Sequence, residues 1–290
     1  MSGRGPAMRA PGLVALALCL ALASGCSTTS LVYNRLDWMA GWQAGQYADL
    51  TKEQEALFDQ RFGSLWAWHR ATELPAYAQD LRRLAALAGQ PIDAAQAATS
   101  VDAYFAWWRR SLERLSPDLC ALLATLDAGQ VRSTLERIDR NNAEDAEEYA
   151  RPERKLREQS TGRTIKALRR WLGPLSEAQR DSIVRWGEAR ELTYDLWLDN
   201  GRAWRARFAE TLAERTGGAQ FCARLDQLLL RSNDDLDPPA RARITRSRED
   251  WKALMVMLSR DLSPQQRRHF REELLELAGE IEALVAQGRK

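Results

Sequence analysis

Leu175-Ser176-Glu177-Ala178-Gln179 is one of four similar helix starts that decide the fold of this chain. The Ser176 oxygen can accept a hydrogen bond from the backbone amide of Gln179, and the Gln179 side chain can reach back to the amide of Ser176. This reciprocal arrangement is a capping box. The same order of leucine, polar residue and glutamine recurs at residues 50–54, 126–130 and 262–266. Each copy predicts that an α-helix begins there, with the preceding leucine under its first turn.

Helical spacing of apolar residues continues outward from these starts, and no stretch alternates convincingly as a β-strand would. We predict helices over residues 31–42, 51–66, 75–88, 94–115, 129–171, 176–215, 221–229, 239–259 and 263–286. Pro75 should interrupt one helix, Ser116-Pro117 should restart another, and Pro152 should kink or break a third. The sequence therefore predicts an all-α fold, either an elongated multi-helix bundle or antiparallel helical hairpins with long helices.

Two of these helices carry further expectations. Residues 176–215 would form one helix of about 60 Å at 1.5 Å per residue, with Trp186, Trp197 and Trp204 on one face. In the last helix, the apolar positions step by four and three, which predicts docking along another helix. These positions are Phe270, Leu274, Leu277, Ile281 and Leu284.

The beginning of the chain has the pattern of a targeting segment. Arg4 and Arg9 form a positive leader, and residues 13–23 form an apolar run too short to span a bilayer. The run Leu-Ala-Ser-Gly-Cys that ends at Cys26 resembles the lipobox of bacterial lipoproteins, although Ala23 stands where that pattern usually has leucine. The alternative is an ordinary cleaved signal with an incidental cysteine.

The lipobox resemblance implies that residues 1–25 are removed as a signal peptide. Cys26 would then carry a diacylglycerol on its thiol and a further chain, such as palmitate, on its amine, and the attachment would be effectively permanent. Ser27 follows it, which by resemblance favours the outer membrane, facing the periplasm. Residues 26–30 would form a lipidated tether and residues 31–290 a single helical domain, with a sub-boundary near 116–128.

The charge balance and the cysteines limit the class of protein. The chain has 42 basic and 40 acidic residues; without Arg4 and Arg9 of the leader, 40 face 40. This balance argues against nucleic-acid binding, which needs a basic surface. Cys120 and Cys222 either pair as a disulfide or lie as two buried thiols. Neither belongs to a CxxC or Cys/His cluster, so we expect no zinc site.

Two family resemblances add to this interpretation. The run LVYNRLDW at residues 31–38, with Trp42, Tyr47, Trp-His-Arg at 68–70 and Glu-Leu-Pro at 73–75, resembles an uncharacterised family of proteobacterial lipoproteins, a domain of unknown function. That resemblance implies a location and a class but no catalytic residues. The four helix starts are similar to the Leu-Thr-x-x-Gln motif of Spy/CpxP-type periplasmic proteins, which cradle unfolded clients or sense envelope stress.

The first candidate site is the polar patch just after the tether. It consists of Tyr33, Asn34, Arg35, Asp37 and Trp38. These residues either form a recognition surface for lipid or a partner, or they hold the first helix to the bundle. We favour the second role, with Arg35 and Asp37 as a buried ion pair.

The second candidate site is the pair His69 and Glu73, spaced to share one face of a helix. They could bind one metal or move one proton, but a catalytic zinc site needs a third ligand, so we expect no metal and no cofactor. The favoured interpretation is a histidine at a helix end with a salt-bridged glutamate.

These observations favour binding over catalysis. We expect a scaffold, chaperone-like or envelope-maintenance factor whose partner is an envelope protein or peptidoglycan; the chain has 11 tryptophans, and an exposed aromatic patch would suit either a hydrophobic client or sugars. The alternative is a periplasmic enzyme acting on the cell wall, with Glu73 or another acid as catalyst.

Overall fold

The structure is a computed structural model that describes residues 33–231 and 236–288, and within these ranges it contains helices and no strand. The predicted all-α class is therefore confirmed. The predicted signal peptide, Cys26 and residues 27–32 lie outside the described residues. The α-helices are α3 (Leu36–Gly45), α4 (Lys52–Trp68), α5 (Leu74–Leu87), α6 (Ala94–Leu123), α7 (Ala128–Tyr149), α8 (Glu153–Leu172), α9 (Glu177–Ala189), α10 (Tyr194–Ala213), α11 (Ala219–Leu230), α12 (Pro238–Arg260) and α13 (Pro264–Gln287), and a π-helical turn, η1 (His69–Glu73), joins α4 to α5.

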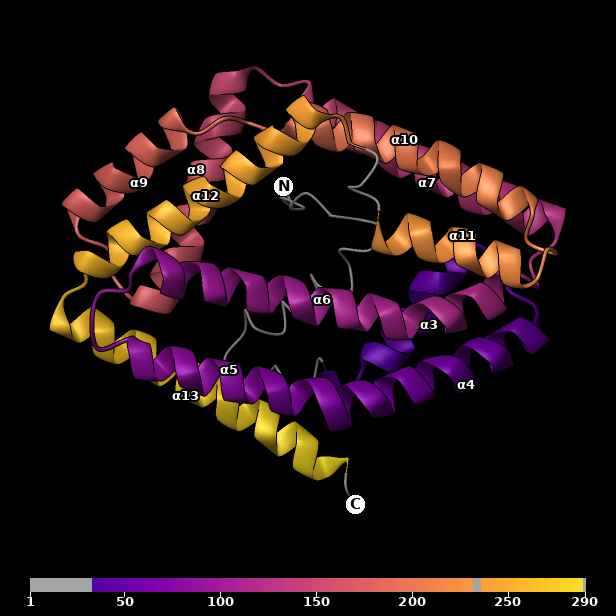
Figure 1. Ribbon diagram of the computed structural model, residues 1–290, viewed down its shortest axis with the longest axis horizontal. Helices are drawn as coiled ribbons and strands as arrows, with labels where there is room; N and C mark the ends of the chain where they lie inside the picture. Colours follow the sequence, from indigo (N-terminus) through magenta and orange to yellow (C-terminus); the bar gives the residue numbers. More distant parts are fainter. Residues whose placement is uncertain (1–32, 232–235, 289–290) are drawn as a thin grey trace, which may run out of the picture.

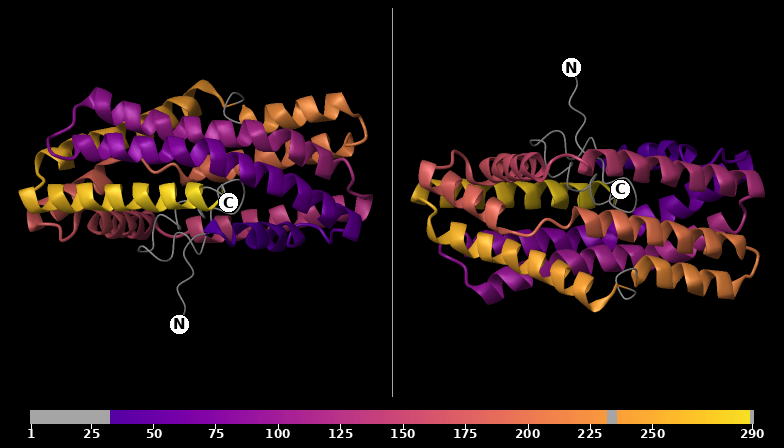
Figure 2. Two further views of the ribbon diagram at one scale, coloured as in Figure 1. Left: turned by 90° about the horizontal axis from the view of Figure 1, so that it is seen from below. Right: turned by 90° about the horizontal axis from the view of Figure 1, so that it is seen from above.

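The helices form two long hairpins that lie side by side in a flattened, elongated body (Figures 1 and 2). In the first hairpin, α4, η1 and α5 run from one end of the molecule to the other, and α6 returns. In the second, α9 and α10 run in one direction, and α11 and α12 return. Helices α7 and α8 connect the hairpins, and α13 packs along α5.

Two of the helix starts meet at one end of the molecule, which we call the Gln54 end. The Gln54 side chain donates to Oε1 of Gln130 (3.0 Å), and the Gln130 side chain donates to Oε1 of Gln54 (2.6 Å). Gln54 also donates to the carbonyl of Thr125, and Gln130 to the carbonyl of Asp49. Each Oε1 also accepts from the backbone amide of its own N-cap residue, Thr51 or Asp127. The donors and the acceptor of both buried glutamine side chains therefore all have partners.

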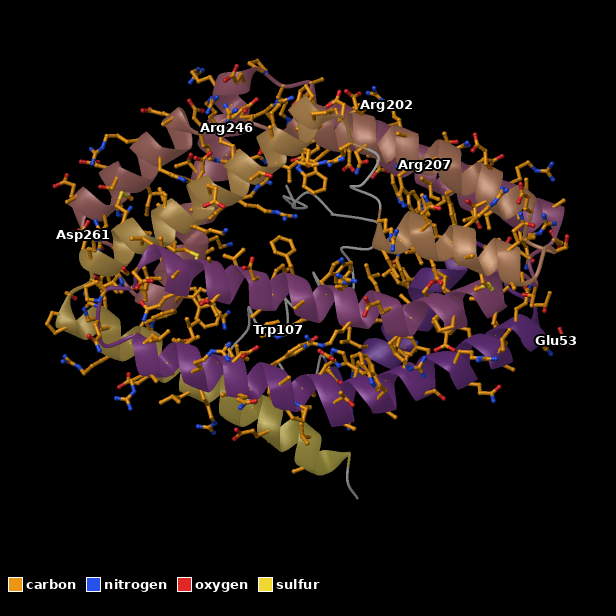
Figure 3. The ribbon with its side chains drawn as sticks, viewed as in Figure 1. Glu53, Trp107, Arg202, Arg207, Arg246 and Asp261 are labelled. Carbon is orange, nitrogen blue, oxygen red and sulfur yellow. A yellow bond between two sulfur atoms is a disulfide. The ribbon has the colours of Figure 1, made fainter. Side chains whose placement is uncertain are left out.

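The other two helix starts repeat this arrangement at the opposite end, the Gln179 end. Gln179 and Gln266 donate to each other's Oε1, both at 2.9 Å. Gln179 also donates to the carbonyl of Asp261, and Gln266 to the carbonyl of Pro174. In both pairs, each glutamine thus donates to the carbonyl of the residue that directly precedes the leucine of the other helix start. Figure 3 labels Glu53 and Asp261, which mark the two ends.

All four predicted capping boxes are present, at Thr51, Asp127, Ser176 and Ser263. A fifth, between Asp93 and Gln96 at the start of α6, was missed by sequence reasoning; its hydrogen bonds are exposed. The leucines before the four predicted caps lie in apolar clusters, as expected: Leu50, Leu126, Leu175 and Leu262.

The predicted interruptions at two prolines are wrong. Pro75 does not end the helix, because η1 directly before it widens the backbone and α5 continues. Pro117 lies inside α6 rather than at a restart. The helix is held on both sides of this proline, since Ser116 donates to Asp226 and Cys120 is bonded to Cys222 of α11. The chain turns at 124–127 instead.

The predicted 40-residue helix over 176–215 is also wrong. It is divided into α9 and α10, because Arg190 takes an extended conformation. The Arg157 guanidinium donates to three carbonyls at the end of α9 and so satisfies acceptors that a helix end leaves open. The predicted tryptophan face is lost: Trp186 packs on Trp251, and Trp197 is largely exposed. Pro152 gives a full break between α7 and α8.

Three apolar clusters stabilise the body. One joins α6, α7, α10 and α11 near the Gln54 end, one joins α5 to α13, and one joins α8, α9 and α12 near the Gln179 end. The predicted stripe of α13 docks along α5, where Leu274, Leu277, Ile281 and Leu284 are buried. Cys120 and Cys222 form a disulfide between α6 and α11, with Cα atoms 5.4 Å apart.

Candidate functional site

The segment before α3 attaches that helix to the body. Tyr33 is buried, its ring stacks on Trp66 of α4 with centroids 4.2 Å apart, and its hydroxyl lies 3.1 Å from Nδ1 of His69. Leu36 is buried in the same cluster as Tyr77. Tyr33 and Leu36 therefore hold the start of α3 to the first hairpin.

Asn34 extends this attachment to the end of the chain. Its side-chain oxygen accepts from Arg70 (2.9 Å), and its nitrogen donates to Gln287 of α13 (3.2 Å). The Arg70 guanidinium also lies 5.2 Å from the centroid of the Tyr33 ring, a cation–π distance. Asn34 thus connects the α3 segment, η1 and α13.

The remaining residues of the predicted patch behave differently. Arg35 is exposed, so the buried ion pair that we expected with Asp37 is wrong; the side chain of Asp37 lies outside the described residues. Trp38 is 68% exposed, and Trp42, one turn later, is 57% exposed. The sequence motif is therefore divided into an inward part that packs and an outward part that faces solvent.

His69 lies between two tyrosine hydroxyls. Nδ1 is 3.1 Å from the Tyr33 hydroxyl and Nε2 is 3.4 Å from the Tyr77 hydroxyl. Burial lowers the pKa of His69 to about 4 and raises that of Tyr77 to about 12, since each group would be charged in an apolar surrounding. The imidazole is therefore neutral at pH 7, and one ring nitrogen donates while the other accepts.

Glu73 is paired with an arginine of α6. Its side chain is 1% exposed, and its two oxygens accept from Nε and Nη2 of Arg110 at 2.9 and 2.8 Å. A forked pair of this kind neutralises the carboxylate and fixes its position. Sequence reasoning expected a salt bridge for Glu73 but missed Arg110, because no local pattern connects positions 37 residues apart.

The π-helical turn brings these groups together. All five residues of η1 lie between α4 and α5, and His69 and Glu73 are its two buried members. Turns of this type inside α-helices occur frequently at functional sites. Trp107 of α6, labelled in Figure 3, packs on Tyr77 and donates to Asp80.

A groove opens beside the cluster, between α4 with η1 and the end of α13. Its volume is about 350 Å³. Its lining is mostly small or apolar, and Arg70 contributes the charge: Gly63, Trp66, Ala67, Arg70, Ala71, Val285 and Gly288. A Cβ at Gly288 would lie 2.3 Å from Cδ of Arg70, so a larger residue there would require the Arg70 side chain to move.

Two other kinds of site are absent from the part of the chain that the structure describes. Among the described residues, no group of three His, Cys, Asp or Glu side chains could hold a metal ion. In the same part of the chain, no helix is long and apolar enough to cross a bilayer. Nε2 of His269 donates to the carbonyl of Arg170 (3.2 Å) and lies 3.9 Å from Oε1 of Glu273.

The geometry defines the class: an all-helical protein in which a buried histidine–tyrosine cluster anchors an exposed aromatic helix. The chain belongs to a family of unknown function, DUF6279, whose model matches residues 46–240. That match begins after α3 and ends within α12. No curated protein and no solved structure matches the chain.

Proposed function

We propose that this protein is an envelope lipoprotein that acts by binding, as a scaffold or chaperone-like factor. Residues 1–25 are its signal peptide, and acyl chains on Cys26 hold it in the inner leaflet of the outer membrane, facing the periplasm. The lipobox pattern before Cys26 supports the attachment. Membership of a family of unknown function is compatible with this role and assigns no reaction.

The observation that carries the binding role is the opposite placement of two kinds of side chain. The groups best suited to acid–base chemistry, His69 and Glu73, are buried and hydrogen-bonded to neighbouring side chains. Large aromatic side chains, in contrast, are exposed on α3, α6, α10 and α12. Exposed apolar side chains are the means by which a protein binds an apolar or aromatic partner.

Metabolic labelling with palmitate tests the attachment. Cys26→Ser should abolish the label and release the protein from the membrane fraction. Cys19→Ser is the matched control, because Cys19 would leave with the signal peptide and its loss should leave the label unchanged. Full labelling of Cys26→Ser would contradict the proposal.

Photo-crosslinking in living cells tests the binding role. A photoreactive residue at exposed position 197 of α10 should capture an envelope protein or peptidoglycan, whereas the same residue at buried position 183 of α9 should capture nothing. If position 197 captures no partner and the purified protein releases wall fragments, the protein is a cell-wall enzyme instead.

A further inference from the structure

Helix α3 carries an unusual share of the exposed apolar surface. Eight large hydrophobic residues are exposed in the described part of the chain, and three of them lie in these ten residues. Trp42 is 57% exposed and Met39 is 41% exposed. Trp38 makes an interaction within the molecule and is still 68% exposed.

The exposed residues share one side of the helix. Positions 38, 39 and 42 lie within about 100° of arc at 3.6 residues per turn. The opposite side faces the body: Leu36 is buried, and a Cβ at Gly41 would lie 3.8 Å from the ring of Phe58 in α4. Because its inner side is packed on α4, the helix presents a fixed aromatic face. Figure 2 shows α3, the darkest ribbon, on the outside of one broad face of the body.

The length of the tether limits where this face can be. Only residues 27–32 separate Cys26 from Tyr33. A fully extended chain covers at most about 3.6 Å per residue, so the Cα atoms of Cys26 and Tyr33 are at most about 25 Å apart. Tyr33 is fixed to the body by Trp66 and His69. If Cys26 carries lipid, α3 therefore stays near the membrane surface.

We propose that α3 lies in the interface of the leaflet that holds the acyl chains of Cys26, with Trp38, Met39 and Trp42 among the phospholipid headgroups. This inference rests on the proposed lipid attachment. Tryptophan favours the headgroup region, because its ring is apolar and its N–H can still bond to water or phosphate. Exposed Arg35, one turn before Trp38, can pair with lipid phosphates. The acyl chains of Cys26 and the aromatic face of α3 would then be two points of contact. Together they would fix which face of the body is turned to the membrane.

Quenching of tryptophan fluorescence by brominated lipid tests this docking. The full mature lipoprotein is reconstituted in vesicles of phosphatidylethanolamine with phosphatidylglycerol as the minor lipid, with and without bromine on the acyl chains. Wild-type emission should be quenched, and Trp38→Gln with Trp42→Gln should remove most of that quenching. Trp197→Gln is the matched control, since Trp197 of α10 is 59% exposed and far along the sequence from the tether; it should leave the quenching unchanged.

Further measurements on the same samples distinguish failure of the α3 docking from failure of the lipid attachment. Mass spectrometry reads the acyl chains on Cys26, and circular dichroism confirms that each variant is folded. An acylated protein whose quenching is the same with and without Trp38 and Trp42 would overturn the docking and leave the lipid attachment standing. A chain without acyl groups would overturn both. A wild-type dimer in sedimentation that Trp42→Gln dissociates would assign the face to a second copy of the chain and overturn the docking.

Discussion

The two ends of the molecule use the same device under different constraints. At each end, two helix starts are joined by a reciprocal pair of buried glutamines, Gln54 with Gln130 and Gln179 with Gln266. At the Gln54 end, a disulfide also joins α6 to α11. In the described part of the chain, the Gln179 end has no such covalent link.

Each end also receives the tip of the other hairpin. Arg215, at the tip of the second hairpin, donates to the carbonyl of Leu126 at the Gln54 end. Ile92, at the tip of the first hairpin, donates to Ser259 near the Gln179 end. The Gln179 end therefore keeps its glutamine pair without a covalent bond, and the disulfide at the Gln54 end is an addition to the same arrangement.

Removing the disulfide should produce the largest difference in stability between the two ends. Replacing Cys120 and Cys222 by alanine frees a loop of 102 residues and should lower the free energy of unfolding by about 2–5 kcal/mol. Urea unfolding measures the loss, and hydrogen exchange locates it: α10 and α11 should lose protection, whereas α9 and α13 should keep it. An equal loss of protection at both ends would show that the ends do not unfold separately.

Acid should weaken the region between the ends before the ends themselves. The pKa of His69 in the folded protein is about 4, below the usual 6.5, so its contribution is complete above pH 6.5 and is lost as the pH falls toward 4. A shift of this size corresponds to about 3 kcal/mol. The glutamine amides do not titrate in this range. Hydrogen exchange should show α5 losing protection first, and His69→Gln should flatten the pH dependence of unfolding. A slope unchanged in that variant would contradict the assignment.

Breaking one glutamine pair should lower the free energy of unfolding by about the same amount at either end. Gln130→Leu leaves Gln54 and the carbonyl of Asp49 with unmet hydrogen bonds in a buried site, which costs about 2–3 kcal/mol. Gln266→Leu should cost a similar amount. The control is Gln96→Leu, which opens an exposed capping box outside either pair and should cost about 0.5 kcal/mol. If Gln130→Leu costs as little as Gln96→Leu, the glutamine pair does not stabilise the fold.

A double-mutant cycle isolates the pair itself. Gln54→Leu with Gln130→Leu should cost less than the sum of the single changes, with a coupling of about 1–2 kcal/mol. Gln54→Leu with Gln266→Leu combines opposite ends and should be additive. Urea unfolding of the five variants and the wild type measures both, and coupling across the ends would mean that they act as one unit.

A smaller effect than that of breaking a glutamine pair should come from removing a cap side chain. Thr51→Ala and Ser176→Ala each remove one hydrogen bond to the first turn, from α4 and α9 respectively, and should each cost about 1 kcal/mol. Thermal melting measures both. Unchanged melting of either variant would show that the glutamine alone holds that helix start.

Local chemistry explains what could be predicted from the sequence. The capping boxes and the α13 stripe depend on residues three to four positions apart, so their pattern is readable in one dimension. The pairing of Gln54 with Gln130 could not be read, because the same glutamine satisfies a capping box whether or not it meets a partner. The path of α6 through Pro117 could not be read either, since contacts with distant Asp226 and Cys222 hold that helix together.

The candidate site divides in the same way. A structural role was predicted for the segment around Tyr33, and its packing on Trp66 and His69 agrees with it. The exposure of Arg35 was not predicted, because a single helix turn gives no information on which side the body lies. Arg70 and Arg110 gave no signal, since each acts on residues more than 30 positions away.

The π-helical turn sets the rotational phase of α5 relative to α4. A residue added to a regular α-helix rotates all that follows by about 100° around the helix axis, and a π-helical turn absorbs the extra residue without that rotation. Helix α5 therefore presents Tyr77 and Ala78 to α13 only because η1 has shifted its phase relative to α4. Deleting a single residue between 69 and 73 would let this turn become regular α-helix and would keep this face toward α13, whereas drawing all five residues into α-helical turns would rotate it away. The length of that one turn, rather than the composition of either helix, determines which side of α5 meets the end of the chain.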